Sequence, residues 1–266
     1  MDCPSCGALQ EIVTVVEGLV PSASCAACNA IVFAKVDGPV VLVAHDSRVQ
    51  LAEIGCILAG VGFFPVTARD GAEALRLAIA LAPDAAVLDV ALGDVLSLDL
   101  ISAIRAKPRT AGMKIVLVAS VYNRTAYKRK PTSLYGADDY VEQHHLTDML
   151  PEKLQALLGV PTKLRVTASH PAVDPGVDAA RMRNSGENAA ERVRATAHTI
   201  VADIALYHHA EIESVITEGT LDGLQGPLRE GRRILAQLIP EKEWPSQDPV
   251  LDAFKSLVDS MRGRPA

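Results

Sequence analysis

Four cysteines near the start of the sequence have the type and spacing of metal ligands. Cys3 and Cys6 form one C-x2-C pair, Cys25 and Cys28 form a second, and 18 residues separate the two pairs. Two thiol pairs at this spacing are typical of a tetrahedral zinc site. Four thiolates leave no coordination position open, so the sequence predicts a structural Zn²⁺ rather than a catalytic one. A redox dithiol is the alternative, which the second pair disfavours.

A second group of chemically active residues follows two apolar runs. His45 and Asp46 come directly after the aliphatic residues of "VVLVAHDS" at 40–47, and Asp89 lies near the end of "AAVLDV" at 85–90. In a parallel sheet the carboxyl ends of the strands meet at one edge, where ligands and chemistry gather. We therefore expect these three side chains close together. Two interpretations of these side chains are open: an acidic site that accepts a phosphate group, or the remnant of such a site.

Strand and helix patterns alternate from residue 39 to about 159, and they would position these side chains. Short apolar runs predict strands at 40–45, 63–68, 85–90, 114–120 and 138–142. Between and after them, apolar residues every three or four positions predict helices at 47–62, 70–82, 97–106 and 146–159. This order predicts an α/β domain with a five-stranded, parallel, doubly wound sheet. Cys56, among the apolar residues of the first helix, is expected in the core.

The flanking segments have different patterns. Residues 1–37 contain β-branched runs at 9–18 and 30–36, which predict short strands around the cysteines, and the segment resembles a zinc ribbon. A bound metal would supply folding energy that so short a segment lacks. Residues 160–188 are rich in Pro, Ser and Gly and are interpreted as a linker.

Residues 189–266 have helical periodicity without strands. One apolar stripe consists of Val193, Ala197, Ile200, Ile204 and Tyr207. Further helices are predicted from about Pro227 and from Asp248, which would be an N-cap followed by Pro249 in the first turn. A small helical bundle is the first interpretation. A dimerising helix or a docking surface for a partner is the alternative.

The segment 39–159 resembles the receiver domain of bacterial two-component response regulators. The resemblance depends on the order of elements, on the aspartate of "AAVLDV" and on "SLYGADDYVE" before the last helix. It implies a flavodoxin-like fold with Asp89 as phosphoacceptor and Asp46 beside it as an Mg²⁺ ligand. It also implies that Tyr140 is the aromatic residue that reports activation.

Several positions depart from the pattern of that family. His45 replaces a carboxylate, and Gln143 replaces the lysine after the fifth strand, with His144 where a proline is usual. At the end of the fourth strand, Ala119 matches the hydroxyl position, although a shift of one residue would place Ser120 there. Imidazole is a poor ligand for Mg²⁺, and an amide brings no positive charge to a phosphoryl group. We therefore predict a degenerate receiver, or pseudo-receiver, in which phosphorylation and Mg²⁺ binding are weakened or absent.

Two pairs of neighbouring histidines and a basic stretch are interpreted as surface features rather than as functional sites. The vicinal histidines His144/His145 and His208/His209 are interpreted as surface or helix-start residues, because neighbours in sequence rarely point at one ion. The basic stretch 123–136 is interpreted as a solvated loop, with docking of an acidic partner as the alternative. No Ser/His/Asp or Cys/His arrangement and no phosphate-binding loop is evident in the sequence, so we do not expect an enzyme.

Charge and hydropathy restrict the remaining functions. The chain has a net charge of −6, and residues 1–37 carry one basic residue against four acidic ones, Lys35 against Asp2, Glu11, Glu17 and Asp37. Such a surface repels phosphates, which disfavours nucleic-acid binding. No apolar run reaches the ~18 residues of a membrane helix, and no secretion signal precedes the first pair of cysteines. These features predict a cytoplasmic location.

The leading functional hypothesis is a non-enzymatic signalling adaptor that acts through protein–protein contacts. Its partners would be a histidine kinase or a motility or polarity protein, and the tail offers a surface for a homodimer. The alternative is a phosphorylatable response regulator with Asp89 as phosphoacceptor in a phosphorelay. A zinc-ribbon transcription regulator that binds DNA is the third hypothesis.

Overall fold

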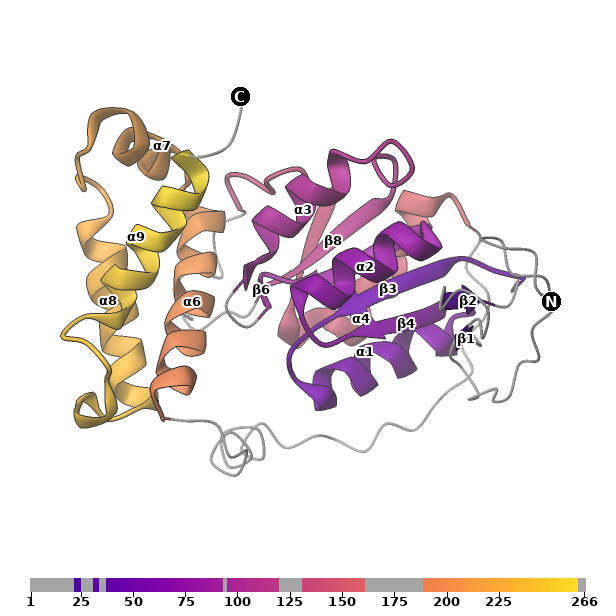
Figure 1. The fold of residues 1–266 in the computed structure, drawn as a ribbon, viewed down its shortest axis with the longest axis horizontal. Helices are drawn as coiled ribbons and strands as arrows, with labels where there is room; N and C mark the ends of the chain where they lie inside the picture. The colour runs from indigo at the N-terminus through magenta and orange to yellow at the C-terminus, as the bar shows by residue number, and fades with distance from the viewer. Residues whose placement is uncertain are drawn as a thin grey trace.

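The computed structural model describes residues 22–24, 31–33, 37–92, 95–119, 131–160 and 189–262. They form a short N-terminal strand pair, a central α/β domain and a C-terminal helical unit (Figure 1). The strand pair is antiparallel and joins β1, Ser22–Ser24, to β2, Ile31–Phe33. β2 lies within the predicted strand 30–36. The predicted strand 9–18 lies outside the described residues, as do the four predicted zinc ligands Cys3, Cys6, Cys25 and Cys28.

The central sheet has five parallel strands in the order β4-β3-β5-β8-β9. These are β3 (Val40–Ala44), β4 (Phe64–Ala68), β5 (Ala85–Asp89), β8 (Lys114–Ala119) and β9 (Asp139–Glu142). The predicted five-stranded parallel sheet is therefore confirmed. The strand order reverses direction between β3 and β5, and in such sheets ligands bind at this switch point, beyond the carboxyl ends of the strands.

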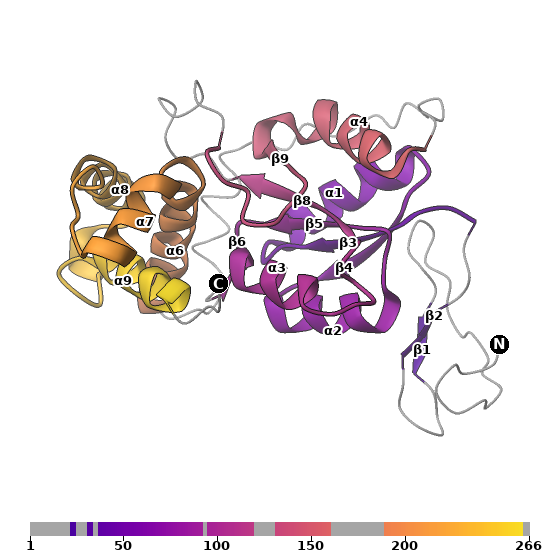
Figure 2. The ribbon, with the colours of Figure 1, turned by 90° about the horizontal axis from the view of Figure 1, so that it is seen from above.

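Helices cover both faces of the sheet (Figure 2). One face carries α1 (Arg48–Gly60) and α4 (Leu146–Leu158), and the other carries α2 (Gly71–Leu81) and α3 (Ser97–Arg105). The side chains of β3 alternate accordingly: Val41 and Val43 face α1 and α4, whereas Leu42 and Ala44 belong to the opposite core. This alternation is the period of two that a strand imposes, and near-continuous apolar strands are typical of a sheet buried on both faces.

Local capping sets the helix starts. Ser47 accepts a hydrogen bond from Gln50 N at 3.4 Å and caps α1 directly after Asp46. At α2, Asp70 accepts from Glu73 N at 2.7 Å, and the Glu73 carboxylate accepts from Arg69 N at 2.9 Å. These side chains satisfy amide groups that have no partner inside the helix.

The expectation that Cys56 lies in the core is wrong, because this cysteine is exposed. The buried stripe of α1 contains Ile54, Ile57 and Leu58. Two residues of helix rotate a side chain by about 200°, so Cys56 points away from the side on which Ile54 and Leu58 lie.

A short hairpin follows Asp89 and was not predicted. It consists of β6, Ala91–Leu92, and β7, Val95–Leu96, and leads directly into α3. A 3-10 turn, Gln143–His145, likewise stands between β9 and α4. Both irregular pieces lie at the carboxyl edge of the sheet, where they shape the candidate site.

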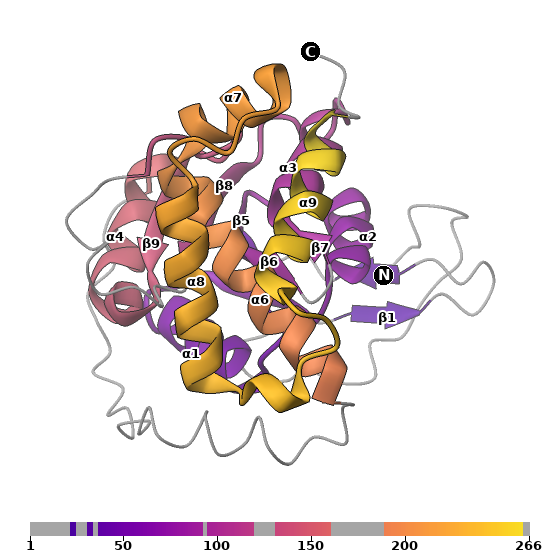
Figure 3. The ribbon, with the colours of Figure 1, turned by 90° about the vertical axis from the view of Figure 1, so that its left-hand side faces the viewer.

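The C-terminal unit contains four described helices, α6 (Ala189–Tyr207), α7 (His209–Glu218), α8 (Gln225–Leu238) and α9 (Pro249–Arg262). The predicted helical segment is confirmed, and Asp248 caps α9 by accepting from Leu251 N at 3.1 Å. The separate helix α7 was not predicted, and α8 begins before Pro227. Seen from the helical side, α8 and α9 lie in front of α6 (Figure 3). None of the described helices is both long and apolar enough to cross a membrane.

The helical unit and the α/β domain share one hydrophobic core. A single buried cluster extends from Leu92, Leu96 and Leu98 to Val193 and Ala197 of α6. α6 lies between the sheet domain and the other helices and contacts β6 (Figure 1). The predicted bundle is thus packed onto the receiver-like domain as well as onto itself.

Candidate functional site

Three residues predicted from the sequence converge at the switch point of the sheet. Asp89 ends β5, and His45 and Asp46 follow the neighbouring strand β3. His45 Nδ1 lies 2.9 Å from Asp46 Oδ1, and His45 Nε2 lies 3.6 Å from Asp89 Oδ2. One potential ligand atom from each of the three lies within 4.8 Å of the others. The expectation that these side chains meet is confirmed.

The three side chains differ strongly in exposure. Asp89 is 4% exposed and His45 is 6% exposed, whereas half of the Asp46 side chain, 50%, is accessible to solvent. Asp89 Oδ1 is buried and accepts no hydrogen bond of good geometry from the described residues. The site therefore combines a buried carboxylate, Asp89, with a solvated one, Asp46.

Burial and charge shift the acidity of both carboxylates. Burial raises the pKa of Asp89 to about 6; the charge of His45 opposes this rise and the charge of Asp46 adds to it. Burial also pushes the pKa of Asp46 upward, but the hydrogen bond and the charge of His45 outweigh it, so the pKa of Asp46 lies below its ordinary value. His45 is thus the group that holds two nearby negative charges together.

His45 can meet these neighbours in two protonation states. Its Nδ1 lies 2.9 Å from Asp46 Oδ1 and 3.0 Å from Ser47 N, which donates to it. A bare Nδ1 accepts from Ser47 N but leaves two acceptors, Nδ1 and Asp46 Oδ1, facing each other. A ring with Nδ1–H donates to Asp46 instead; its Nε2 is an acceptor when the ring is neutral and carries a proton directed toward Asp89 when the ring is protonated. The ring therefore offers a donor to both carboxylates in its protonated state.

The remaining positions expected from the family are only partly described. Ala119 ends β8, is fully buried and offers no hydroxyl, while Ser120 lies outside the described residues. Gln143 begins the turn after β9 and is half-buried. Tyr140, on β9, packs against the core with Lys153 Nζ 5.4 Å from its ring centroid. The resemblance assigns Ala119 to the fourth strand, Tyr140 to the fifth and Gln143 to the turn after it. In the structure these residues lie on β8, on β9 and in the turn after β9.

Two lysines of the described chain pair with aspartates at the amino ends of β8 and β9, away from Asp89. Lys153 Nζ bonds both oxygens of Asp139, at 2.7 and 2.8 Å, and Lys114 Nζ bonds Asp138 at 3.1 Å. Within the part of the chain that the structure describes, the charged side chains that shift the pKa of Asp89 are His45 and Asp46. A lysine that takes the role of the missing one is thus not found there.

The backbone of Asp89 connects the pocket to the helical unit. The Asp89 carbonyl accepts a hydrogen bond from the buried hydroxyl of Ser97, the first residue of α3. Ser97 N also donates to Val90 O at 3.1 Å, which closes the β6–β7 hairpin. Because α6 contacts β6, the segment that directly follows Asp89 is in contact with the C-terminal helices.

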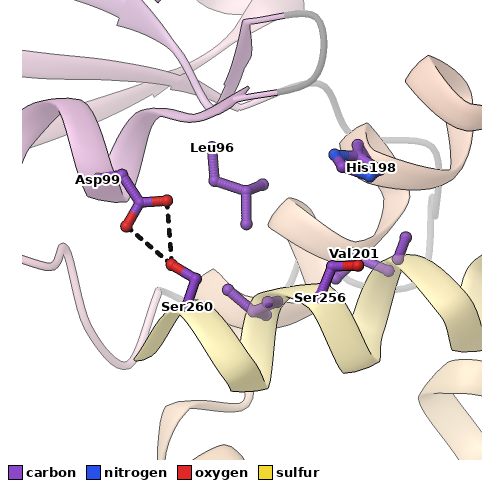
Figure 4. Close-up of a pocket in the computed structure, with 8 residues that line it drawn as sticks. Leu96, Asp99, His198, Val201, Ser256 and Ser260 are labelled. Carbon is purple, nitrogen blue, oxygen red and sulfur yellow. Dashed lines mark hydrogen bonds between the residues drawn. The ribbon is translucent and has the colours of Figure 1, made fainter. Parts of the chain in front are cut away.

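A small cavity of about 100 Å³ lies between α3, α6 and α9 (Figure 4). Leu96, Val201 and Leu257 line it, and at one side Ser260 Oγ donates to Asp99 at 2.8 Å. The pockets of drug-sized ligands measure about 300–1,000 Å³. The cavity is therefore a packing gap in the interface, and the Asp99–Ser260 bond joins α9 to α3 across it.

A polar clamp joins the helical unit to the loop before β9. Thr132 N donates to Leu206 O at 2.8 Å, and Tyr135 Oη donates to Ala205 O at 3.0 Å. His209 Nδ1 lies 3.1 Å from the same Tyr135 hydroxyl, with the two rings edge to face. No pattern in the sequence indicated this clamp, because it joins residues 70 and 74 positions apart.

Comparisons with known proteins find similarity over part of the chain. No protein-family model matches the chain. The transcriptional regulatory proteins PrrA of Mycobacterium bovis, Mycobacterium tuberculosis and Mycobacterium leprae are each 35% identical over 124 residues, 46% of this chain and 51% of each relative. The chain thus spans about half the length of the curated relatives that it matches.

Solved structures similar to the chain include the chemotaxis response regulator CheY4 of Vibrio cholerae. The two chains are 21% identical, the match covers 46% of this chain and 99% of that chain, and the TM-score is 0.41. Another is the receiver domain of a sensor histidine kinase from Pseudomonas aeruginosa, crystallised with magnesium in its active-site cleft; it has 22% identity, covers 46% and 99% of the two chains and has a TM-score of 0.41. The observed strand order of the central α/β domain is that of the flavodoxin-like doubly wound fold.

Proposed function

We propose that the protein is a non-enzymatic signalling adaptor of the response-regulator type, whose receiver domain has a weakened or absent phosphorylation switch and acts through protein–protein contacts. The observation that carries the proposal is the position of His45 between Asp46 and Asp89. The imidazole takes up the space and part of the charge that a bound Mg²⁺ would supply.

His45 and a bound cation would compete for the place between Asp46 and Asp89. Two unit charges 4 Å apart interact by about 4 kcal/mol at an effective dielectric constant of about 20. A cation that enters the pocket would meet an imidazole that is a poor ligand for Mg²⁺ and that repels it when protonated. Gln143 adds no positive charge to offset a phosphorylated Asp89. Cation and phosphoryl group are therefore both held less firmly than with two carboxylates and a lysine.

The helical unit provides the contact surface that an adaptor requires. It packs on the hairpin after Asp89 and clamps the loop before β9. A partner of the receiver domain, such as a histidine kinase or a motility or polarity protein, would encounter this composite surface rather than an isolated sheet domain. We extend the proposal to a structural Zn²⁺ held by the N-terminal cysteines as a second docking module.

Phosphorylation chemistry tests the proposal directly. The full chain is incubated with acetyl phosphate and Mg²⁺ and its intact mass is measured. We expect little or no gain of a phosphoryl group, because His45 and Gln143 oppose the metal and the phosphoryl dianion. The double variant His45→Asp/Gln143→Lys restores both missing charges and is expected to gain the mass of one phosphoryl group.

Two controls make this outcome decisive. The triple variant with Asp89→Asn removes the acceptor and should abolish any gain seen in the double variant. A stoichiometric phosphoryl adduct on the unsubstituted chain, lost on Asp89→Asn, would replace the adaptor with the second candidate, a phosphorylatable response regulator. The burial of Asp89 at the end of β5 favours that candidate.

A third candidate is a transcription regulator that binds DNA. The PrrA relatives are named transcriptional regulatory proteins, but the similarity spans about half of their length. The acidic N-terminal segment opposes contact with phosphates. We therefore rank nucleic-acid binding after the two receiver-based functions.

A further inference from the structure

Three side chains converge where β9 passes into α4. Glu142 is the last residue of β9, and His144 and His145 end the 3-10 turn that follows. His144 Nε2 lies 3.3 Å from Glu142 Oε2, and the two imidazole rings are 4.0 Å apart at their centroids. One potential ligand atom from each of the three residues lies within 4.8 Å of the others.

From this geometry we propose a zinc site formed by Glu142, His144 and His145, with ligands different from those of the His45, Asp46 and Asp89 group and from the N-terminal cysteines. Ligand atoms that share a tetrahedral zinc ion at about 2.0–2.1 Å lie roughly 3.3 Å from each other. The His144–Glu142 separation already has this value. The remaining distances require side-chain rotation of the two histidines, which are exposed at the surface.

The chemistry of the ligands selects the class of ion. Two imidazoles and one carboxylate suit late divalent transition metals, whereas Mg²⁺ prefers an all-oxygen environment. The Glu142 side chain is 13% exposed and is held in place, while the His144 side chain is 47% exposed. Three protein ligands leave one tetrahedral position on the solvent side, open to water or to a side chain of a docking partner.

The start of α4 opposes a cation, and the size of this effect decides whether the site is viable. A helix N-terminus disfavours a nearby positive charge only weakly at the surface. Glu142 counters this as a direct ligand, and Asp148 in the first turn of α4 adds a second negative charge nearby. A carboxylate in contact with the ion outweighs the partial charge of the helix end.

The chain contains a matched pair that the structure arranges differently. His208 and His209 are also neighbours in sequence, but His208 Nδ1 faces Glu211 at 3.5 Å and His209 Nε2 faces Glu213 at 3.2 Å. His209 Nδ1 is engaged with the Tyr135 hydroxyl. The two rings therefore serve separate carboxylates, and this pair is the internal control for the site at His144 and His145.

Zinc stoichiometry tests the proposal. Zinc equivalents bound by the full chain are measured by competition with a chromophoric chelator, and affinity is measured by titration calorimetry. We expect His144→Ala/His145→Ala to bind one equivalent fewer than the unsubstituted chain, and His208→Ala/His209→Ala to bind the same number. Glu142→Gln should weaken the same equivalent. Replacing the four N-terminal cysteines by serine removes only equivalents that belong to the cysteines.

Equal zinc stoichiometry in the unsubstituted chain and the His144→Ala/His145→Ala variant would overturn the proposal. So would an equal loss in the His208→Ala/His209→Ala variant, or zinc binding that appears only at millimolar concentration. Circular dichroism verifies that each exposed substitution leaves the fold intact. Asp89 takes no part in the site, so the phosphorylation experiment and the zinc experiment can fail independently.

Discussion

His45 contacts two carboxylates whose environments differ, one buried and one half-solvated. At the scale of single residues, this contact holds a buried carboxylate, Asp89, and a solvated one, Asp46, beside the same imidazole ring. The sequence identified His45, Asp46 and Asp89, because strand ends in a parallel sheet share an edge. It did not identify Glu142 beside His144 and His145, because the distance between side chains in an irregular turn depends on its backbone path.

Asp89 leads to a prediction about pH. Its pKa is raised from 3.8 to about 6 in the folded chain, so protonation of Asp89 stabilises the fold below about pH 4, and this contribution is lost as pH rises through 6. Asp89→Asn cannot ionise and avoids this loss. Its stability relative to the unsubstituted chain should therefore increase between about pH 4 and pH 7, by roughly 3 kcal/mol at about 1.4 kcal/mol per pKa unit.

Urea unfolding of the full chain at several pH values measures this difference. The variant also loses the ion pair with His45, so the change with pH is the relevant quantity rather than the absolute stability. Asp84→Asn, at an aspartate before β5 whose side chain accepts from Val40 N, is the comparison for an unburied carboxyl. A stability difference that is constant across this pH range would contradict the assignment of a buried, ionisable Asp89.

Secondary-structure elements around the pocket combine predictable and unpredictable parts. Strands and helices of the α/β domain follow the apolar periods of the sequence, and their caps at Ser47 and Asp70 are local. The β6–β7 hairpin and the turn Gln143–His145 have no such period, since each is only a few residues long. These two irregular pieces nevertheless shape the carboxyl edge of the sheet and direct the chain toward the helical unit.

The start of α3 carries a prediction at this scale. Ser97 is fully buried and donates to the Asp89 carbonyl, so Ser97→Ala leaves a buried acceptor without this donor. We expect a loss of about 1–3 kcal/mol in the free energy of unfolding. Ser102→Ala, at an exposed position of the same helix, should have little effect. Chemical denaturation of the two variants measures the difference, and equal losses would show that the Ser97 bond is not structural.

At the scale of the whole molecule, the helical unit and the receiver-like domain share a core and two polar connections. The core joins β6 and α3 to α6, while Asp99–Ser260 and the clamp at Tyr135 join their edges. A domain with its own closed core would unfold independently. Here neither unit covers its apolar surface without the other, so we expect the two units to unfold together.

The single tryptophan makes this testable. Trp244 lies in the helical unit, so its fluorescence follows that unit, while far-ultraviolet circular dichroism follows both units. We expect coincident denaturation curves for the full chain. Leu257→Ala, at a fully buried residue lining the interface cavity, should lower stability by about 2–5 kcal/mol, whereas Leu238→Ala at a 51% exposed position should change it little. Separate transitions in the unsubstituted chain would contradict the shared core.

The sequence by itself determined which segments form strands and helices, and which residues follow the strand ends, because hydrophobic periods and caps act over a few residues. It also indicated where the pocket departs from an active receiver, since residue type alone distinguishes an imidazole from a carboxylate. The tertiary structure decided what the apolar stripe of α6 is buried against, that Cys56 faces solvent, and which histidine pair converges on a carboxylate. The apolar face of a helix indicates that this face is buried, but it does not indicate which element covers it. Contacts between residues distant in sequence form only when the whole chain folds.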